Sequence, residues 1–272
     1  MLKQGFLSLA ESLDELDTGL TVNADHNPGE GNYVGYVDGR VLHPLEPQRP
    51  VLPTTEYVHD AFRSAVLNPH FACVGAKSAI QRDAYRFGLY DELASPRGTH
   101  ALAHDLSHFI EDQPALERAS EFTTFVACFQ GPTALSERQF ERLLWSQLQC
   151  LHDLDCARHA WDATVSDNPN DPQFSFSFGG RAFFVVGLHA ASSRWSRRFA
   201  WPALVFNAHH QFERLRQEGR FVRMQRAIRE RDTALQGDIN PMVSTFGEFS
   251  EARQYSGRHV EADWRCPFHI NT

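Results

Sequence analysis

The most regular pattern of hydrophobic and polar residues runs from residue 174 to residue 188. Phenylalanines and serines alternate over residues 174–178, which is the period of a strand buried on one face. Residues 182–188 are apolar without alternation, as in a strand covered on both faces. The Gly179-Gly180 pair between these two runs can take the positive φ angles of a tight hairpin turn. The pattern therefore predicts a β-hairpin whose second strand lies in the core and ends at His189.

The clearest helix start is at Ser136. Ser136 and Gln139 have the spacing of a capping box, and Leu135 and Phe140 have that of a hydrophobic staple. Other caps and periodicities predict the remaining elements. They are helices at residues 54–67, 101–112, 207–219 and 221–237, strands at 122–129 and 201–206, and a short strand, a turn at Gly75 and a helix within residues 71–93.

Residues 1–53 are rich in glycine and proline after a short helical start. We expect them to wrap the surface or cover a pocket rather than to form a domain. No internal repeat and no shift in composition marks a domain boundary along the chain. The sequence therefore predicts one domain spanning residues 1–272, of the α+β class, with a mixed β-sheet and flanking helices.

Composition narrows the possible functions. Of 272 residues, 42% are hydrophobic, which is typical of a globular core, and the net charge of −8 disfavours non-specific binding to nucleic acid. Acidic residues between positions 11 and 17 replace the apolar run of a signal peptide, and no apolar run approaches the ~18 residues of a membrane span. The five cysteines are odd in number and irregularly spaced, without a CxxC pair. We therefore expect a cytoplasmic protein with reduced thiols.

Three histidines, His100, His104 and His108, are spaced four residues apart on one predicted helix. That spacing can bind a metal ion. The apolar residues between positions 102 and 110 mark the buried face, and the histidines lie nearly opposite at about 100° per residue. The pattern favours a solvated histidine stripe.

The sequence contains no GxGxxG, Walker, HExxH or GxSxG motif, which removes the usual support for dinucleotide, nucleotide, zinc-protease and hydrolase functions. Cys266, flanked by aromatic residues in WRCPF, could ligate a metal such as haem iron as a thiolate. A buried structural cysteine is the alternative. His189 is the rival ligand, and His209, on the apolar face of its predicted helix, is the third. Spacing alone does not choose among them.

These residues lie within a set of longer sequence motifs, which follow one another between residues 71 and 268. The motifs are GAKSA with YRFGLY, WDATVSDNP, FSFGGRAFFVVGLHAASSRWSRR, LVFNAHHQFERLR, IRERDTALQG, INPM, FGEFSEARQYSGR and WRCPF. In these motifs the chain resembles the YqcI/YcgG family of small haem-dependent N-oxygenases. It departs from the expected pattern at Ala190, where we expect proline, and at Ala208, where we expect leucine.

The resemblance implies that the chain binds haem b and oxidises a guanidino or amino nitrogen. Free L-arginine is the leading substrate, and hydroxylation of its guanidino nitrogen would give N-omega-hydroxy-L-arginine in the biosynthesis of a specialised metabolite such as an antibiotic. Arginines that follow the core strand are candidates to pair with haem propionates or with a substrate carboxylate: Arg194, Arg197 and Arg198. C-terminal residues are candidates to hold the guanidinium: Glu248, Glu251 and Tyr255. Because the chain carries no flavin or iron–sulfur motif, electrons or peroxide must come from an external donor.

Two other interpretations remain open from the sequence. The chain could bind haem as a sensor or carrier without turnover, or it could bind no haem and use its aromatic C-terminal residues only as core. Surface ion pairing is the alternative for each of the charged candidates.

Overall fold

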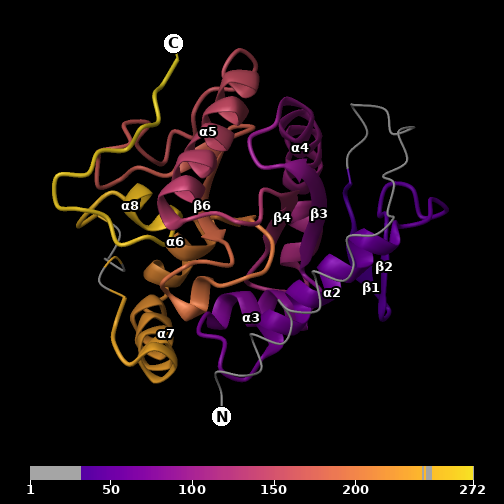
Figure 1. Cartoon of the computed structure of the whole chain (residues 1–272), viewed down its shortest axis with the longest axis horizontal. Coiled ribbons are helices and arrows are strands. Elements are labelled where there is room, and N and C mark those ends of the chain that lie inside the picture. The colour runs from indigo at the N-terminus through magenta and orange to yellow at the C-terminus, as the bar shows by residue number, and fades with distance from the viewer. Residues whose placement is uncertain (1–31, 241, 243–246, 272) are drawn as a thin grey trace.

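The computed structural model describes residues 32–240, 242 and 247–271 (Figure 1). The short helix expected at the start of the chain lies outside these residues. The first described elements form a small hairpin of β1 (Gly35–Val37) and β2 (Arg40–Leu42). The others are α2 (Pro53–Leu67), α3 (Val74–Gln81), β3 (Tyr85–Glu92), α4 (Pro96–Glu117), β4 (Thr124–Gly131), α5 (Glu137–Asp155), β5 (Phe176–Phe178), β6 (Arg181–Leu188), the 3₁₀ turn η1 (Trp195–Arg197), β7 (Ala203–Ala208), α6 (His209–Gln217), α7 (Phe221–Gln236) and α8 (Ala252–Tyr255).

The main sheet has five strands in the order β3-β4-β7-β6-β5. Strands β3 and β4 are parallel and are joined through α4, whereas β7 runs antiparallel to both of its neighbours, β4 and β6. The predicted α+β fold with a mixed sheet and flanking helices is confirmed.

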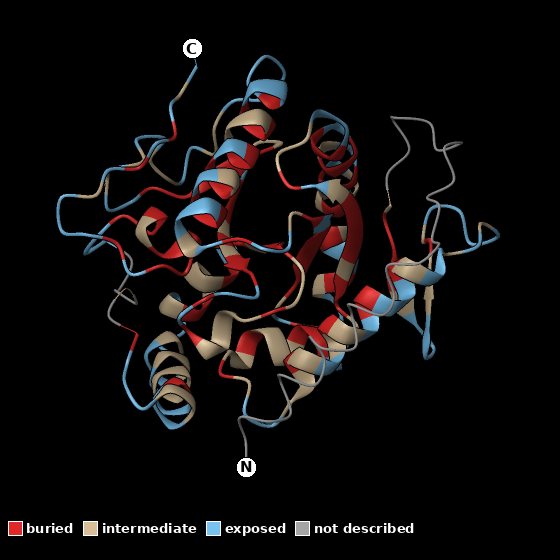
Figure 2. Cartoon of the chain, viewed as in Figure 1, coloured by how far each residue is buried: buried red, intermediate tan, exposed pale blue. Residues whose placement is uncertain are grey.

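Both faces of the sheet are covered. On one face, α4 and α5 pack on alternate residues of the central strands, such as Phe125 and Phe129 of β4. On the other face, α2 and α3 pack on the intervening residues, such as Val126 and Cys128. The ribbon coloured by burial shows the central strands red between these helices (Figure 2). The alternation of β4 between two apolar cores is the reason that its sequence reads as a continuous hydrophobic run.

The predicted hairpin is confirmed as β5 and β6, which pair antiparallel with Phe176 opposite Phe183. Gly179 and Gly180 form the turn with φ angles of 59° and 69°, which few other residues adopt without strain. The expectation that the second strand is covered on both faces needs one correction. Phe184 and Val186 are only half-buried, because their face of β6 borders a cavity.

The predicted start of α5 is confirmed, whereas α4 begins at Pro96, five residues before the expected start at residue 101. Ser136 caps α5 and its capping box with Gln139 is formed. At α6 the predicted cap was one residue early: Asn207 lies within β7, and Ala208, the last residue of that strand, is the N-cap of the helix. The amide of Asn207 donates instead to the carbonyls of Phe184 and Val205, both at 3.2 Å.

The prediction for residues 71–93 was partly wrong. The expected turn at Gly75 is absent, because Gly75 is the second residue of α3, which is preceded by no strand and ends at Gln81. Residues 85–92, which were expected to be helical, form β3. Tyr85, Phe87 and Leu89 are all buried in the core under α2. Parallel pairing with β4 along this segment therefore overrides its local helical pattern.

Candidate functional site

A cavity of about 250 Å³ lies under the α2 and α3 face of the sheet, beside β6 and β7. At ~30 Å³ per water molecule it has room for about eight waters, which is the scale of an organic ligand rather than of an ion. Strand β6, strand β7 and helices α2, α3, α6 and α7 all contribute to its lining. The sheet forms one wall of the cavity. Its register brings the lining residues of the two strands side by side, with Phe184 opposite Asn207 and Val186 opposite Val205.

Apolar side chains form most of the wall opposite the sheet. Helix α7 lines the cavity with Phe221, Met224 and Ile228, which recur at the spacing of one helical face. This helix is attached to the rest of the chain by polar contacts, because Arg194 forms ion pairs with Asp232 of α7 and with Asp238 just beyond it. The cavity is therefore an apolar chamber with a helix as one wall.

Arg197 is the main cationic group of this chamber. Its guanidinium donates to the carbonyls of Gly187 and Gln254 at 3.2 Å and of Tyr255 at 3.5 Å. No carboxylate among the described residues forms an ion pair with it. Burial lowers the pKa of Arg197 to about 10, an effect that the charge of Asp232 partly offsets. A cation held only by carbonyls beside a cavity is suited to an incoming anion.

Cys73 supplies a sulfur atom to the same cavity. It is the N-cap of α3, and its Sγ accepts a hydrogen bond from the amide of Ala76 at 3.4 Å. Burial raises the pKa of the Cys73 thiol, while the amides of Gly75 and Ala76 and the charge of Arg197 act in the opposite direction. The thiol is therefore neutral. A thiolate at this position would be stabilised by the N-terminus of α3 and by the guanidinium of Arg197.

Glu251 is the acid of the cavity, and its side chain is only 5% exposed. Its Oε1 accepts hydrogen bonds from the hydroxyls of Ser175 and Tyr255, both at 2.6 Å. Burial raises the pKa of Glu251 to about 8, against the lowering effect of these two hydrogen bonds. At neutral pH the group is therefore a protonated acid with its hydrogen-bonding partners already in place.

His209 lines the same cavity as Glu251 and is 3% exposed. Its Nε2 lies 3.3 Å from Oε1 of Glu213, one helical turn later on α6. Burial lowers the pKa of His209, so the imidazole is neutral at physiological pH.

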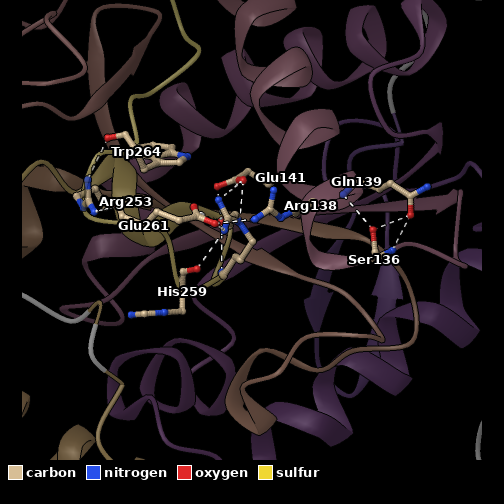
Figure 3. Close-up of polar contacts among 10 residues, drawn as sticks. Ser136, Arg138, Gln139, Glu141, Arg253, His259, Glu261 and Trp264 are labelled. Carbon is tan, nitrogen blue, oxygen red and sulfur yellow. Dashed lines mark hydrogen bonds and ion pairs between the residues drawn. The ribbon is translucent and has the colours of Figure 1, made fainter.

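The segment that carries Glu251 and Tyr255 is fastened to α5 by a buried ion pair (Figure 3). Arg258 donates from Nε and Nη2 to Oε2 of Glu141 at 2.9 and 2.8 Å. Arg258 also pairs with Glu261, which in turn pairs with the exposed Arg138 of α5. The segment that begins with the cavity acid is therefore anchored to α5 by Arg258, which follows α8 in the sequence.

The structure brings together four of the residues predicted from sequence. Arg197, His209 and Glu251 line the cavity, and Tyr255 bonds to Glu251. Glu248 is exposed.

The remaining two predicted arginines have local partners. Arg194 is held by the two aspartates described above, and the Arg198 guanidinium lies 4.0 Å above the ring of Trp195 while its Nε donates to the Ser192 carbonyl.

The two metal ligands preferred from sequence do not line the cavity. Cys266 is 7% exposed within the core under α4 and α5, and burial raises its pKa to about 12. His189 stacks on Phe140 of α5 with ring centroids 4.4 Å apart, and burial lowers its pKa to about 4. Cys73 was missed because a single cysteine two residues before a glycine carries no spacing signal. Its position at the start of a helix beside Gly75 was the one available clue.

The fold and the cavity define an α+β protein with a largely apolar cavity beneath one face of a mixed sheet. A family model described as the YqcI/YcgG family matches residues 62–269, and the chain belongs to that family. It is similar to a Bacillus subtilis (strain 168) protein described as "Uncharacterized protein YqcI", with 27% identity over 208 residues, 73% of this chain and 80% of that protein. No solved structure matches. Within the described residues, no helix has the length and apolar character needed to cross a membrane.

Proposed function

We propose that this protein is a haem-dependent N-oxygenase that hydroxylates a guanidino nitrogen, with free L-arginine as the leading substrate. Membership of the YqcI/YcgG family and the sequence motifs support the proposal. The observation that carries it is the pairing, in one apolar cavity, of a sulfur donor at Cys73 with the guanidinium of Arg197, which has no carboxylate partner among the described residues. We place the activity in the cytoplasm and in specialised metabolism.

The cavity residues fit the chemistry of haem, but the space of about 250 Å³ is smaller than the macrocycle, so binding would require the wall formed by α7 to move outward. Apolar side chains of β6 and α7 suit the macrocycle, and Arg197 suits a propionate. Cys73 and His209 line the cavity with a thiol and an imidazole, and either could hold the iron. Haem, when bound, supplies the oxidising chemistry, while the protein supplies orientation and electrostatics.

The Glu251, Tyr255 and Ser175 cluster fits the substrate side of the reaction. Near a guanidinium, the carboxyl of Glu251 would lose its proton, because an adjacent positive charge favours the ionised form. The resulting carboxylate is already held by two hydroxyl groups at 2.6 Å. Glu251 would therefore bind the cationic group and release one proton as it does so.

The decisive experiment is a spectrum of the purified protein after haem loading, followed by turnover. We expect a Soret band that shifts on adding L-arginine, and hydroxyarginine detected by mass spectrometry when a reductase with NADPH, or hydrogen peroxide, is supplied. A Soret band without product under any donor would instead favour a haem sensor or carrier. A protein that stays colourless after loading would overturn the proposal.

Ligand variants make this test specific to the cavity. We expect Cys73→Ser or His209→Ala to change the Soret band, and the matched changes Cys266→Ser and His189→Ala to leave it unaltered. A reduced carbon-monoxide peak near ~450 nm would identify thiolate ligation, and one near ~420 nm would favour histidine. Loss of the band only in the Cys266 or His189 variants would contradict ligation in the cavity and would place the iron on the α4 and α5 side of the sheet.

A further inference from the structure

The histidine stripe of α4 lies on the opposite side of the sheet from the cavity. The predicted solvated position is confirmed, since His100 and His104 are exposed and His108 is half-buried. Within the stripe, however, two imidazoles converge. Nε2 of His104 and Nε2 of His108 are 3.3 Å apart, and the rings meet edge to face with centroids 4.5 Å apart.

The separation of these two nitrogen atoms matches one coordination geometry. Two zinc–nitrogen bonds of about 2.0–2.1 Å that enclose a tetrahedral angle of about 109° place the nitrogens ~3.3 Å apart. A right angle between bonds of the same length, as in a square-planar site, would bring them to ~2.9 Å. The observed 3.3 Å therefore fits tetrahedral coordination.

The other nitrogen of each ring faces a carboxylate. Nδ1 of His104 lies 3.2 Å from Oδ1 of Asp105, a fully buried residue whose Oδ2 accepts from the Tyr90 hydroxyl at 2.7 Å and from the Asn32 amide at 2.8 Å. Nδ1 of His108 lies 3.4 Å from Glu111 Oε2. A carboxylate behind Nδ1 fixes the ring and directs Nε2 outward, which is the usual support for a metal-binding histidine.

We propose that His104 and His108 form a zinc-binding site on α4, separate from the cavity and independent of the proposed oxygenase function. Among the described residues no third histidine, cysteine or acidic residue joins them as a ligand. Water or a second molecule completes the tetrahedron, so the site is open and its affinity is modest. The ion replaces the proton that the two imidazoles otherwise share.

Zinc binding by the full-length protein, measured by equilibrium dialysis and by calorimetry with Zn²⁺ alone, tests this site. The double variant His104→Ala/His108→Ala is expected to bind about one zinc ion fewer than the wild type. It should also lose the zinc-induced rise in melting temperature that this site contributes. Both side chains are at the surface and alanine favours helix, so circular dichroism should show an unchanged fold.

The matched control is His100→Ala, the same change one turn earlier in the stripe. The Nδ1 atom of His100 is bonded to the Pro96 carbonyl at 2.8 Å, so we expect its removal to leave zinc binding intact. Asp105→Asn should weaken zinc about tenfold or more with both ligands present. Equal zinc uptake by the wild type and the double variant would overturn the proposal, as would an equal loss from His100→Ala.

Discussion

The two faces of the sheet are built from the same strands but are filled differently. On β6, Phe183 and Val185 point to the α4 and α5 face and are fully buried, whereas Phe184 and Val186 point to the cavity and are half-buried. The first face has the close packing of an ordinary core. On the cavity face, some apolar surface stays unburied, and α7 would cover it only if it packed closer to the sheet.

Charge is distributed in the same unequal way. The cavity face holds Arg197, with only carbonyl partners among the described residues, and Glu251, whose pKa burial raises to about 8. Burying such groups costs stability unless a partner compensates for the lost hydration. Perturbed titratable groups around a cavity are typical of functional sites. The comparison teaches that one face is closely packed and stabilises the fold, whereas the other encloses a cavity bordered by perturbed titratable groups.

The largest expected effect comes from shortening two neighbouring side chains of β6 that point to opposite faces of the sheet. Phe183→Ala should reduce the free energy of unfolding by about 3–5 kcal/mol, because it opens a hole in a packed core. Phe184→Ala should cost less than half as much, because that ring already borders empty space. Urea unfolding followed by circular dichroism measures both. Equal losses would mean that the two faces do not differ in packing.

The next test concerns the cavity acid and pH. The folded pKa of Glu251 is about 8 and its unfolded pKa is about 4.3, so the folded state binds the extra proton between these values. Stability should therefore fall as pH rises from about 4.3 to 8, by at most about tenfold in the folding equilibrium per pH unit.

Glu251→Gln cannot titrate and should remove this part of the pH dependence. The wild-type curve also contains histidines with lowered pKa values, such as His59 and His152, which act in the opposite direction. The difference between wild type and variant isolates Glu251, because those histidines are present in both. Parallel curves of unfolding free energy from pH 5 to 8.5 would contradict the raised pKa.

A smaller effect is expected where the packed face supports the cavity. Glu141→Gln weakens the buried pair with Arg258 and should cost about 1–3 kcal/mol. The matched change Arg138→Gln removes an exposed pair with Glu261 and should cost about 0–1 kcal/mol. If the first change also alters the arginine-induced spectral shift while the second does not, the ion pair positions Glu251. If Glu141→Gln and Arg138→Gln reduced the free energy of unfolding equally, the buried ion pair would contribute no more to stability than the exposed one.

Much of the fold could be predicted because its signals are local. The capping box at Ser136 and the glycine pair at residues 179–180 each specify a backbone geometry within a few residues. The strand over residues 85–92 could not be found in this way. Its conformation depends on pairing with β4, which begins more than thirty residues later.

The site was predictable only in part for the same physical reason. Arg197, His209, Glu251 and Tyr255 were found from residue type and sequence motifs, but their convergence depends on how η1, α6 and α8 pack around β6. The face to which a strand-end residue points was not readable from sequence. His189 follows Leu188 on β6, and one residue of register decides whether it faces the cavity or α5.

The smallest expected effect is at His189, and it tests which face of the sheet this side chain serves. Neither ring nitrogen has a hydrogen-bond partner among the described residues, so replacing the imidazole with an apolar ring of similar shape removes a buried polar group without a lost bond. We expect His189→Phe to be neutral or to stabilise the protein by up to about 1 kcal/mol at pH 7.

The gain should grow as pH falls. The folded pKa of His189 is about 4 and the unfolded value is about 6.5, so the wild type loses stability as pH decreases between them. Urea unfolding at pH 7 and pH 5 measures the difference, with the haem spectrum recorded on the same samples. A destabilised variant that no longer binds haem would show that His189 serves the ligand rather than the core.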